Sequence, residues 1–134
     1  MTTREYALER ARLLLERLER EMHRVAELRS ADSIHDLRVS IRRFQQCLAV
    51  FAQFFPHGHT KKIRRRLRQV MELAGNIRNR DIAEKLYRES GGRSTVLPVR
   101  WREEAREFHV EMRRLLLRLE RRDLVRRWGC RLEL

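Results

Sequence analysis

Four basic side chains lie close together between residues 35 and 43. His35, Arg38 and Arg42 are spaced i, i+3 and i+7, so on a helix they share one face. Arg43 lies on another side of the same helix. Guanidinium groups bind phosphate or carboxylate oxygens through paired hydrogen bonds, and an imidazole can donate a ring N–H. Only two acids occur in residues 30–71, so the segment favours anion binding; the plainer alternative is a solvated helix flank.

A second basic segment covers residues 61–68, in which six of the eight side chains are Lys or Arg. No acid follows until Glu72, and like charges three or four residues apart destabilise a helix. An anionic partner would compensate for this repulsion. The bases divide between two flanks of the predicted helix, with Lys62, Arg65 and Arg66 on one and Lys61, Arg64 and Arg68 on the other.

A third candidate element lies further along the same helix. Gly75 and Asn76 interrupt its apolar pattern, so we expect a kink or a break near residues 75–79. Arg78 and Arg80 follow, and backbone amides exposed at a helix restart can bind an anion. A simple capped kink is equally compatible with the local sequence.

The elements that position these residues follow from the apolar pattern. Apolar residues recur at steps of three and four in four segments, and no segment alternates as a strand does. Short connections make consecutive helices antiparallel. The sequence therefore predicts an all-α fold, an up-down four-helix bundle forming one domain over residues 1–134, with helices at about 3–29, 33–55, 60–89 and 97–128.

Residues between the apolar segments indicate where helices start and stop. Ser33 can cap the second helix, and Pro56 ends it because proline cannot continue a helix. Residues 90–95 form the clearest loop. Before that loop the apolar stripe of the third helix resumes as Ile82, Leu86 and Tyr87, which we expect to pack in the core.

The whole chain is strongly basic: 134 residues carry a formal net charge of +13. This surplus predicts a polyanionic partner. Only three of the 32 basic residues are lysines. Either phosphate binding or a GC-rich coding bias explains this excess of arginine over lysine. The sequence shows neither a long apolar run nor a secretory-type N-terminal stretch, so we expect a cytoplasmic protein with no membrane partner. His57 and His59 lack the further ligands that a metal site needs, and nothing indicates a cofactor.

The three basic elements together resemble the CHAD family, the conserved histidine α-helical domain. The resemblance is carried by the run from His35 to Arg43, by the basic opening of the third helix, and by Gly75-x-x-Arg78-x-x-Asp81. It implies an all-helical protein that binds inorganic polyphosphate through a basic groove. By position, it implies a binding site formed by His35, Arg38, Arg42, Arg43, Lys62, Arg65, Arg66 and Arg78.

The resemblance also bears on assembly. Typical members of the family hold two related helical bundles that face each other, and this chain is long enough for one. We therefore expect a homodimer in which each copy contributes one wall of the channel. The chain departs from the family at Gln45, where another base is frequent, and at Asn79, where an acid is common.

We expect a polyphosphate-binding protein that is not an enzyme and that associates with polyphosphate granules. A nucleic-acid-binding protein is the first alternative, since net charge alone supports it, although no base-stacking or groove-fitting motif is evident. An enzyme acting on phosphorylated substrates is the second. Phosphoryl hydrolysis usually needs carboxylates that hold magnesium, and Asp36 and Asp81 are isolated in the sequence. The third is a scaffold whose basic face binds an acidic protein.

Overall fold

The computed structural model describes residues 1–28, 30–93 and 96–134. The prediction of an all-α fold is confirmed, and no strand occurs within these ranges. A short 3-10 turn, η1 (Ala52–Phe54), follows the second helix. The described residues form five α-helices: α1 (Thr3–Glu27), α2 (Ala31–Val50), α3 (His57–Glu89), α4 (Val96–Arg121) and α5 (Leu124–Arg131).

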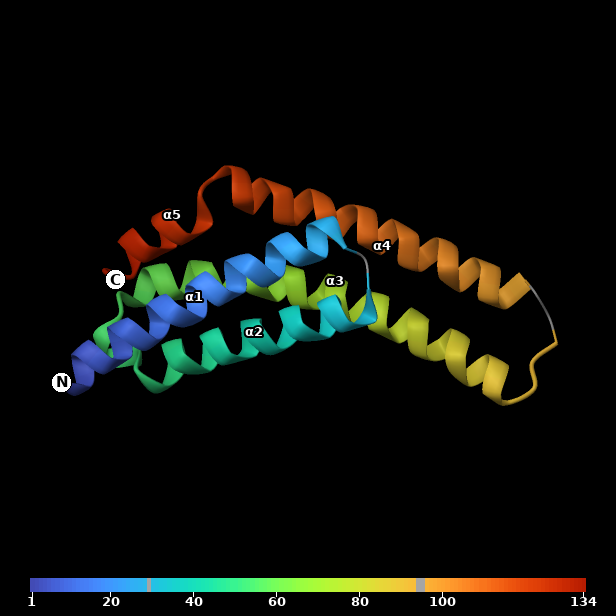
Figure 1. Ribbon diagram of the computed structural model, residues 1–134, viewed down its shortest axis with the longest axis horizontal. Helices are drawn as coiled ribbons and strands as arrows, with labels where there is room; N and C mark the ends of the chain where they lie inside the picture. The colour runs from blue at the N-terminus through green and yellow to red at the C-terminus, as the bar shows by residue number, and fades with distance from the viewer. Residues whose placement is uncertain (29, 94–95) are drawn as a thin grey trace.

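Consecutive long helices run in alternating directions, and both chain termini lie at the same end of the molecule (Figure 1). α1 packs against α2 and α4, and α3 packs against the same two helices. α5 packs against α1. α3 and α4 extend together past α1 and α2 at the end remote from the termini (Figure 1). The basic segment that opens α3 therefore lies at the opposite end from this extension.

The core is built from the apolar stripes of the helices. Leu15, Leu37, Ile41 and Leu67 are among the fully buried side chains, and each such side chain contributes about 1.5–3 kcal/mol by its burial. The stripe of α3 does not continue as core, however. Ile82 is 41% exposed and lines a pocket beside the start of α2, and Leu86 is 58% exposed. The expectation that these two residues pack in the core is wrong, whereas Tyr87 is half-buried against Trp101.

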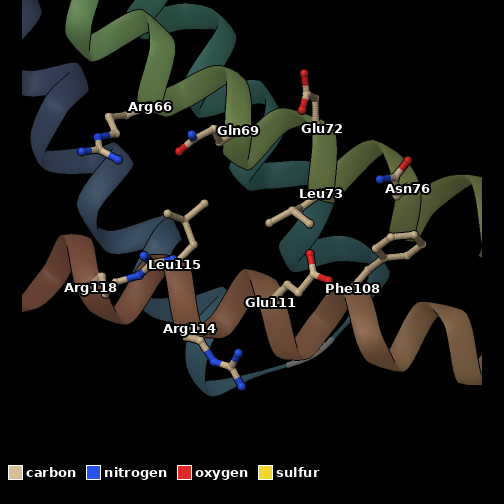
Figure 2. Close-up of a pocket in the computed structure, with 10 residues that line it drawn as sticks. All are labelled: Arg66, Gln69, Glu72, Leu73, Asn76, Phe108, Glu111, Arg114, Leu115 and Arg118. Atoms are coloured by element: carbon tan, nitrogen blue, oxygen red, sulfur yellow. The ribbon is translucent and has the colours of Figure 1, made fainter.

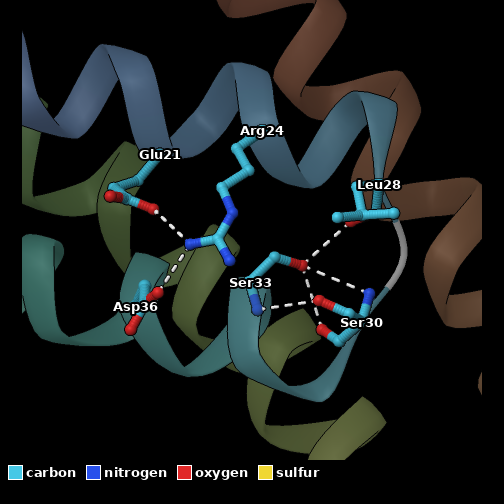
Figure 3. A network of polar contacts seen from close by, with 6 residues as sticks. All are labelled: Glu21, Arg24, Leu28, Ser30, Ser33 and Asp36. Carbon is cyan, nitrogen blue, oxygen red and sulfur yellow. Dashed lines mark hydrogen bonds and ion pairs between the residues drawn. The ribbon is translucent and has the colours of Figure 1, made fainter.

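The start of α2 is fixed by two serines. Ser30, not Ser33, is the N-cap: the Ser33 backbone N–H donates to Ser30 Oγ at 3.0 Å. In return the Ser30 N–H donates to Ser33 Oγ at 3.2 Å, and the Ser33 hydroxyl donates to the Leu28 carbonyl (Figure 3). This reciprocal cap satisfies amides that would otherwise lack partners. It holds the helix that carries His35 in a defined direction.

Several predicted helix limits need correction. The second helix ends at Val50 rather than near 55, and Pro56 is the N-cap of α3. α3 is continuous through 75–79, so the break considered there is absent, while the predicted kink stays a prediction. The bound at Arg29, like Ser94 and Thr95 of the predicted loop, lies outside the described residues.

The predicted fourth helix, 97–128, is in fact two helices. α4 ends at Arg121, and Asp123 adopts a left-handed conformation with φ 53° before α5 begins. A left-handed residue redirects the chain, and Asp is one of the few non-glycine residues that adopt this conformation readily. The turn allows α5 to bury Leu124 and Trp128 in the core.

Candidate functional site

A small pocket between α2 and α3 brings three predicted site residues together. His35, Arg38 and Arg78 line this cavity of about 250 Å³, and Ile34 and Ile82 supply apolar parts of its wall. His35 and Arg78 are exposed, whereas Arg38 is half-buried. The antiparallel packing of α2 on α3 thus joins the first basic segment of the sequence to the third.

Arg38 is the least satisfied cation of this pocket. Burial lowers the pKa of Arg38, and the charges of Arg42 and Arg78 lower it further. Its Nε is buried and has no hydrogen-bond partner. A buried donor without an acceptor is unfavourable, and so is an array of like charges. An anion placed between Arg38 and Arg78 would accept a hydrogen bond from the buried donor and would reduce the repulsion between the arginines.

A second pocket continues the positive surface along the same two helices. Arg42 of α2 lines it together with Arg64 and Arg68 of α3, in a cavity of about 500 Å³. Arg64 also has a buried Nε with no hydrogen-bond partner. We call the two pockets the α2–α3 groove. Lys85 also lines the smaller pocket, but it pairs with Glu89 at 4.0 Å; the basic residues of the groove that form no ion pair, here called the groove cations, are His35, Arg38, Arg42, Arg64, Arg68 and Arg78. From Arg64 to Arg78 the groove follows roughly 20 Å of helix axis at ~1.5 Å per residue.

The structure divides the predicted site residues between two sides of α3. Lys62, Arg65 and Arg66 line a different pocket, beside α5. On the side of α2 their places are taken by Arg64 and Arg68, which belong to the other flank of the basic segment. Arg43 is exposed and lines neither pocket of the groove, although it follows Arg42 directly. Five of the six groove cations are arginines, and these can bind phosphoryl oxygens bidentately.

Two acids near the groove are paired with arginines outside it. Asp36 follows His35 in sequence, but it accepts a hydrogen bond from Arg24 at 2.6 Å, which ties α1 to α2 (Figure 3). Glu84 of α3 pairs with Arg102 of α4 at 2.7 Å. Among the described residues, no ion pair involves a groove cation. No ion pair therefore neutralises the charge of the groove cations within the part of the chain that the structure describes.

One acid does line the groove. Asp81 shares the smaller pocket with His35, Arg38 and Arg78. Burial raises the pKa of the Asp81 carboxyl, although the nearby charge of His109 opposes this rise. The ionised carboxylate reduces the positive potential of the pocket, so Asp81 limits how strongly an anion binds there.

The groove between α3 and α4 differs in its charge. Figure 2 shows Glu72 of α3 and Glu111 of α4 in the same cavity as Arg66 and Arg114. This cavity of about 500 Å³ also has apolar walls, including Phe108. Carboxylates of both helices weaken its attraction for anions, which distinguishes it from the α2–α3 groove.

Sequence reasoning missed Arg64 and Arg68 as partners of Arg42. Their i, i+4 spacing placed Arg64 and Arg68 on one flank of the helix, but the packing of α2 on α3 decides which flank lies beside Arg42. It also missed Arg122, Arg127 and Arg131, which lie with Lys62, Arg65 and Arg66 in the pocket beside α5. No sequence signal marked them, because the separation of α4 from α5 depends on the single left-handed residue Asp123.

Within the described part of the chain, no three His, Cys, Asp or Glu side chains are grouped so that they could hold a metal ion. In the same ranges, no helix combines the length and the apolar character needed to cross a membrane.

Neither the curated proteins nor the solved structures contain a match to the chain. The family model described as CHAD domain matches residues 9–132, which include all five helices apart from the first residues of α1. A match over nearly the whole chain, together with the all-α fold, shows that the chain belongs to the CHAD domain family.

Proposed function

We propose that this chain binds inorganic polyphosphate in the α2–α3 groove and does not turn it over. The observation that carries the proposal is the row of groove cations, which line two adjoining pockets without an ion-pair partner among the described residues. Binding of polyphosphate is a general property of CHAD domains, and the groove is a surface on which this chain could perform it.

The arrangement suits a linear polyanion better than a single small anion. The groove cations are distributed along α3 from Arg64 to Arg78, so successive phosphoryl units can each meet a guanidinium group. Arg42 contributes to the larger pocket and, through its charge, to the environment of Arg38. His35 would donate a ring N–H to a phosphoryl oxygen.

The acids of the groove support binding rather than hydrolysis. Asp36 is engaged with Arg24, and Asp81 is the acidic residue that lines the groove in the described part of the chain. Hydrolysis of a phosphoanhydride usually needs several carboxylates that hold magnesium. Release of phosphate when the protein is incubated with polyphosphate and magnesium would contradict this part of the proposal.

The test is a pair of double variants with equal loss of charge. Arg38→Ala with Arg42→Ala should abolish binding of long-chain polyphosphate in fluorescence anisotropy while helicity is retained. The control is Arg12→Ala with Arg17→Ala, which removes two exposed arginines of α1. Equal binding by the two double variants would show that net charge, not the groove, attracts the ligand.

Competition distinguishes polyphosphate from nucleic acid. Both ligands are linear phosphate polymers whose affinity falls steeply as salt rises, so salt dependence alone does not separate them. Polyphosphate should displace DNA or RNA at a far lower concentration of phosphate groups than the reverse. The opposite order would favour the nucleic-acid alternative.

We also propose that two copies associate to complete the binding channel, and that the protein acts in the cytoplasm at polyphosphate granules. Ile82 lies at the rim of the smaller pocket, and Leu86 is exposed one turn further along α3. A second copy seated on this extension would cover both apolar side chains. Light scattering should show a dimer that Leu86→Glu dissociates; a strict monomer that binds long polyphosphate tightly would refute this assembly.

A further inference from the structure

The cavity between α3 and α4 carries charges of both signs, and these are separated along its length. We call this space of about 500 Å³ the α3–α4 cavity; its size lies within the range of small-molecule sites. Arg66 of α3 and Arg118 of α4 lie at one end (Figure 2). Glu72 of α3 and Glu111 of α4 lie further towards the extension. The cavity therefore has a cationic end and an anionic end.

The helical rise keeps the two ends apart. Six residues separate Arg66 from Glu72 on α3, and seven separate Glu111 from Arg118 on α4, which is about 9–10 Å of helix axis at ~1.5 Å per residue. Opposite charges at this distance attract each other only weakly in water. Among the described residues, none of the four takes part in an ion pair. Each end thus lacks a counter-charge, which a ligand with a charge of each sign would supply.

The wall between the two ends combines apolar side chains with carboxamides. Leu115 is buried, and Leu73 and Phe108 are half-buried beside it. The carboxamides of Gln69 and Asn76 offer both hydrogen-bond donors and acceptors. A peptide backbone also alternates donors and acceptors, and its small side chains can contact the apolar wall. An inorganic polyanion has no apolar part, and it would be repelled by the two carboxylates.

We propose that the α3–α4 cavity binds a short peptide of two or three residues with free termini. The peptide carboxylate contacts Arg66 and Arg118, and the peptide ammonium group contacts Glu72 and Glu111. An extended residue spans ~3.3–3.6 Å, so two or three residues cover about 7–11 Å, which matches the separation of the two ends. Site and ligand both differ from those of the proposed function, so either proposal can fail while the other stands.

The first measurement uses the unaltered protein and three related peptides. Trialanine with free termini should bind saturably, and the side-chain amide signals of Gln69 and Asn76 should shift in NMR spectra while those of Gln45 and Gln53 stay unchanged. N-acetyl-trialanine and trialanine amide should each bind about tenfold more weakly, because each lacks one charged end. Equal binding of the three peptides, or no saturable binding of trialanine, would overturn the proposal.

The second measurement assigns the anionic end by matched variants. Glu72→Gln with Glu111→Gln should lower the affinity for trialanine to about that of the N-acetylated peptide, because the ammonium group then has no counter-charge. The control is Glu103→Gln with Glu107→Gln, which removes the same charge from exposed positions of α4 outside the cavity. An equal loss of affinity in the control would show that overall charge, not the cavity, attracts the peptide, and would refute the site.

The same titrations separate this proposal from polyphosphate binding. Arg38→Ala with Arg42→Ala should leave the affinity for trialanine within about twofold of the wild type, since both residues lie outside the cavity. A protein that binds long-chain polyphosphate but not trialanine would refute the peptide site and leave the proposed function standing.

Discussion

Asp81 offers a sharp test of the groove because its removal should strengthen binding. The carboxylate shares a cavity of about 250 Å³ with Arg38 and Arg78, and such a cavity is about 8 Å across if treated as a sphere. Unit charges ~8 Å apart interact by about 0.5 kcal/mol in water and by about 2 kcal/mol at an effective dielectric constant of ~20. Asp81 is largely exposed, so the lower part of this range applies. Asp81→Asn should therefore raise the affinity for polyphosphate about two- to fivefold at neutral pH.

The pH dependence of this gain follows from the pKa of Asp81. Because burial raises this pKa in the folded protein, the carboxylate is ionised, and repels phosphate, only above that raised value. As pH falls through it, the wild type gains a proton and loses the repulsion. The wild type and Asp81→Asn should therefore converge in affinity at low pH and differ most at neutral pH.

The assay is a titration of fluorescent polyphosphate at fixed ionic strength and several pH values. Glu107→Gln is the control, because it removes the same formal charge from an exposed position on α4 that lines neither pocket of the groove. A weaker affinity in Asp81→Asn, or an equal gain in Glu107→Gln, would refute the assignment of polyphosphate to this groove.

Three further predictions concern the scaffold. Ser30→Ala removes the N-cap of α2 and should lower the free energy of unfolding by about 1 kcal/mol, measured by chemical denaturation. The thiol reagent DTNB should label exposed Cys130 rapidly and Cys47 slowly, because burial raises the pKa of the Cys47 thiol; equal rates would show that α2 opens readily. Asp123→Gly should preserve the thermal midpoint, whereas Asp123→Val should lower it by several degrees, since φ of 53° is unfavourable for a β-branched residue; similar midpoints would place the turn elsewhere.

The fold could be predicted as far as local pattern determines it. Leu37, Ile41 and Phe44 recur at helical spacing, and all three are buried. The break considered at Gly75 is absent for a tertiary reason. A glycine in a helix costs about 1 kcal/mol, but its neighbours Ala74 and Ile77 are buried in the core, and their packing holds the helix continuous.

The site could be predicted only in part, for a similar reason. Helical spacing separates Arg65 from Arg64 as members of two flanks, but it does not say which flank faces α2. That depends on how far α3 is rotated about its axis when it packs, which the core residues of several helices decide together. Arg127 lines a basic cavity because the chain turns at Asp123, and no glycine or proline marks this turn in the sequence.

The continuity of α3 has a consequence for how the protein would act on a polymer. A single unbroken rod of 33 residues carries Arg64 and Arg68 on one side and Arg65 and Arg66 on another. If polyphosphate binds on both sides, each copy is bivalent and can crosslink long chains. Mixing with long-chain polyphosphate should give turbid condensates near charge balance, which dissolve when either component is in excess.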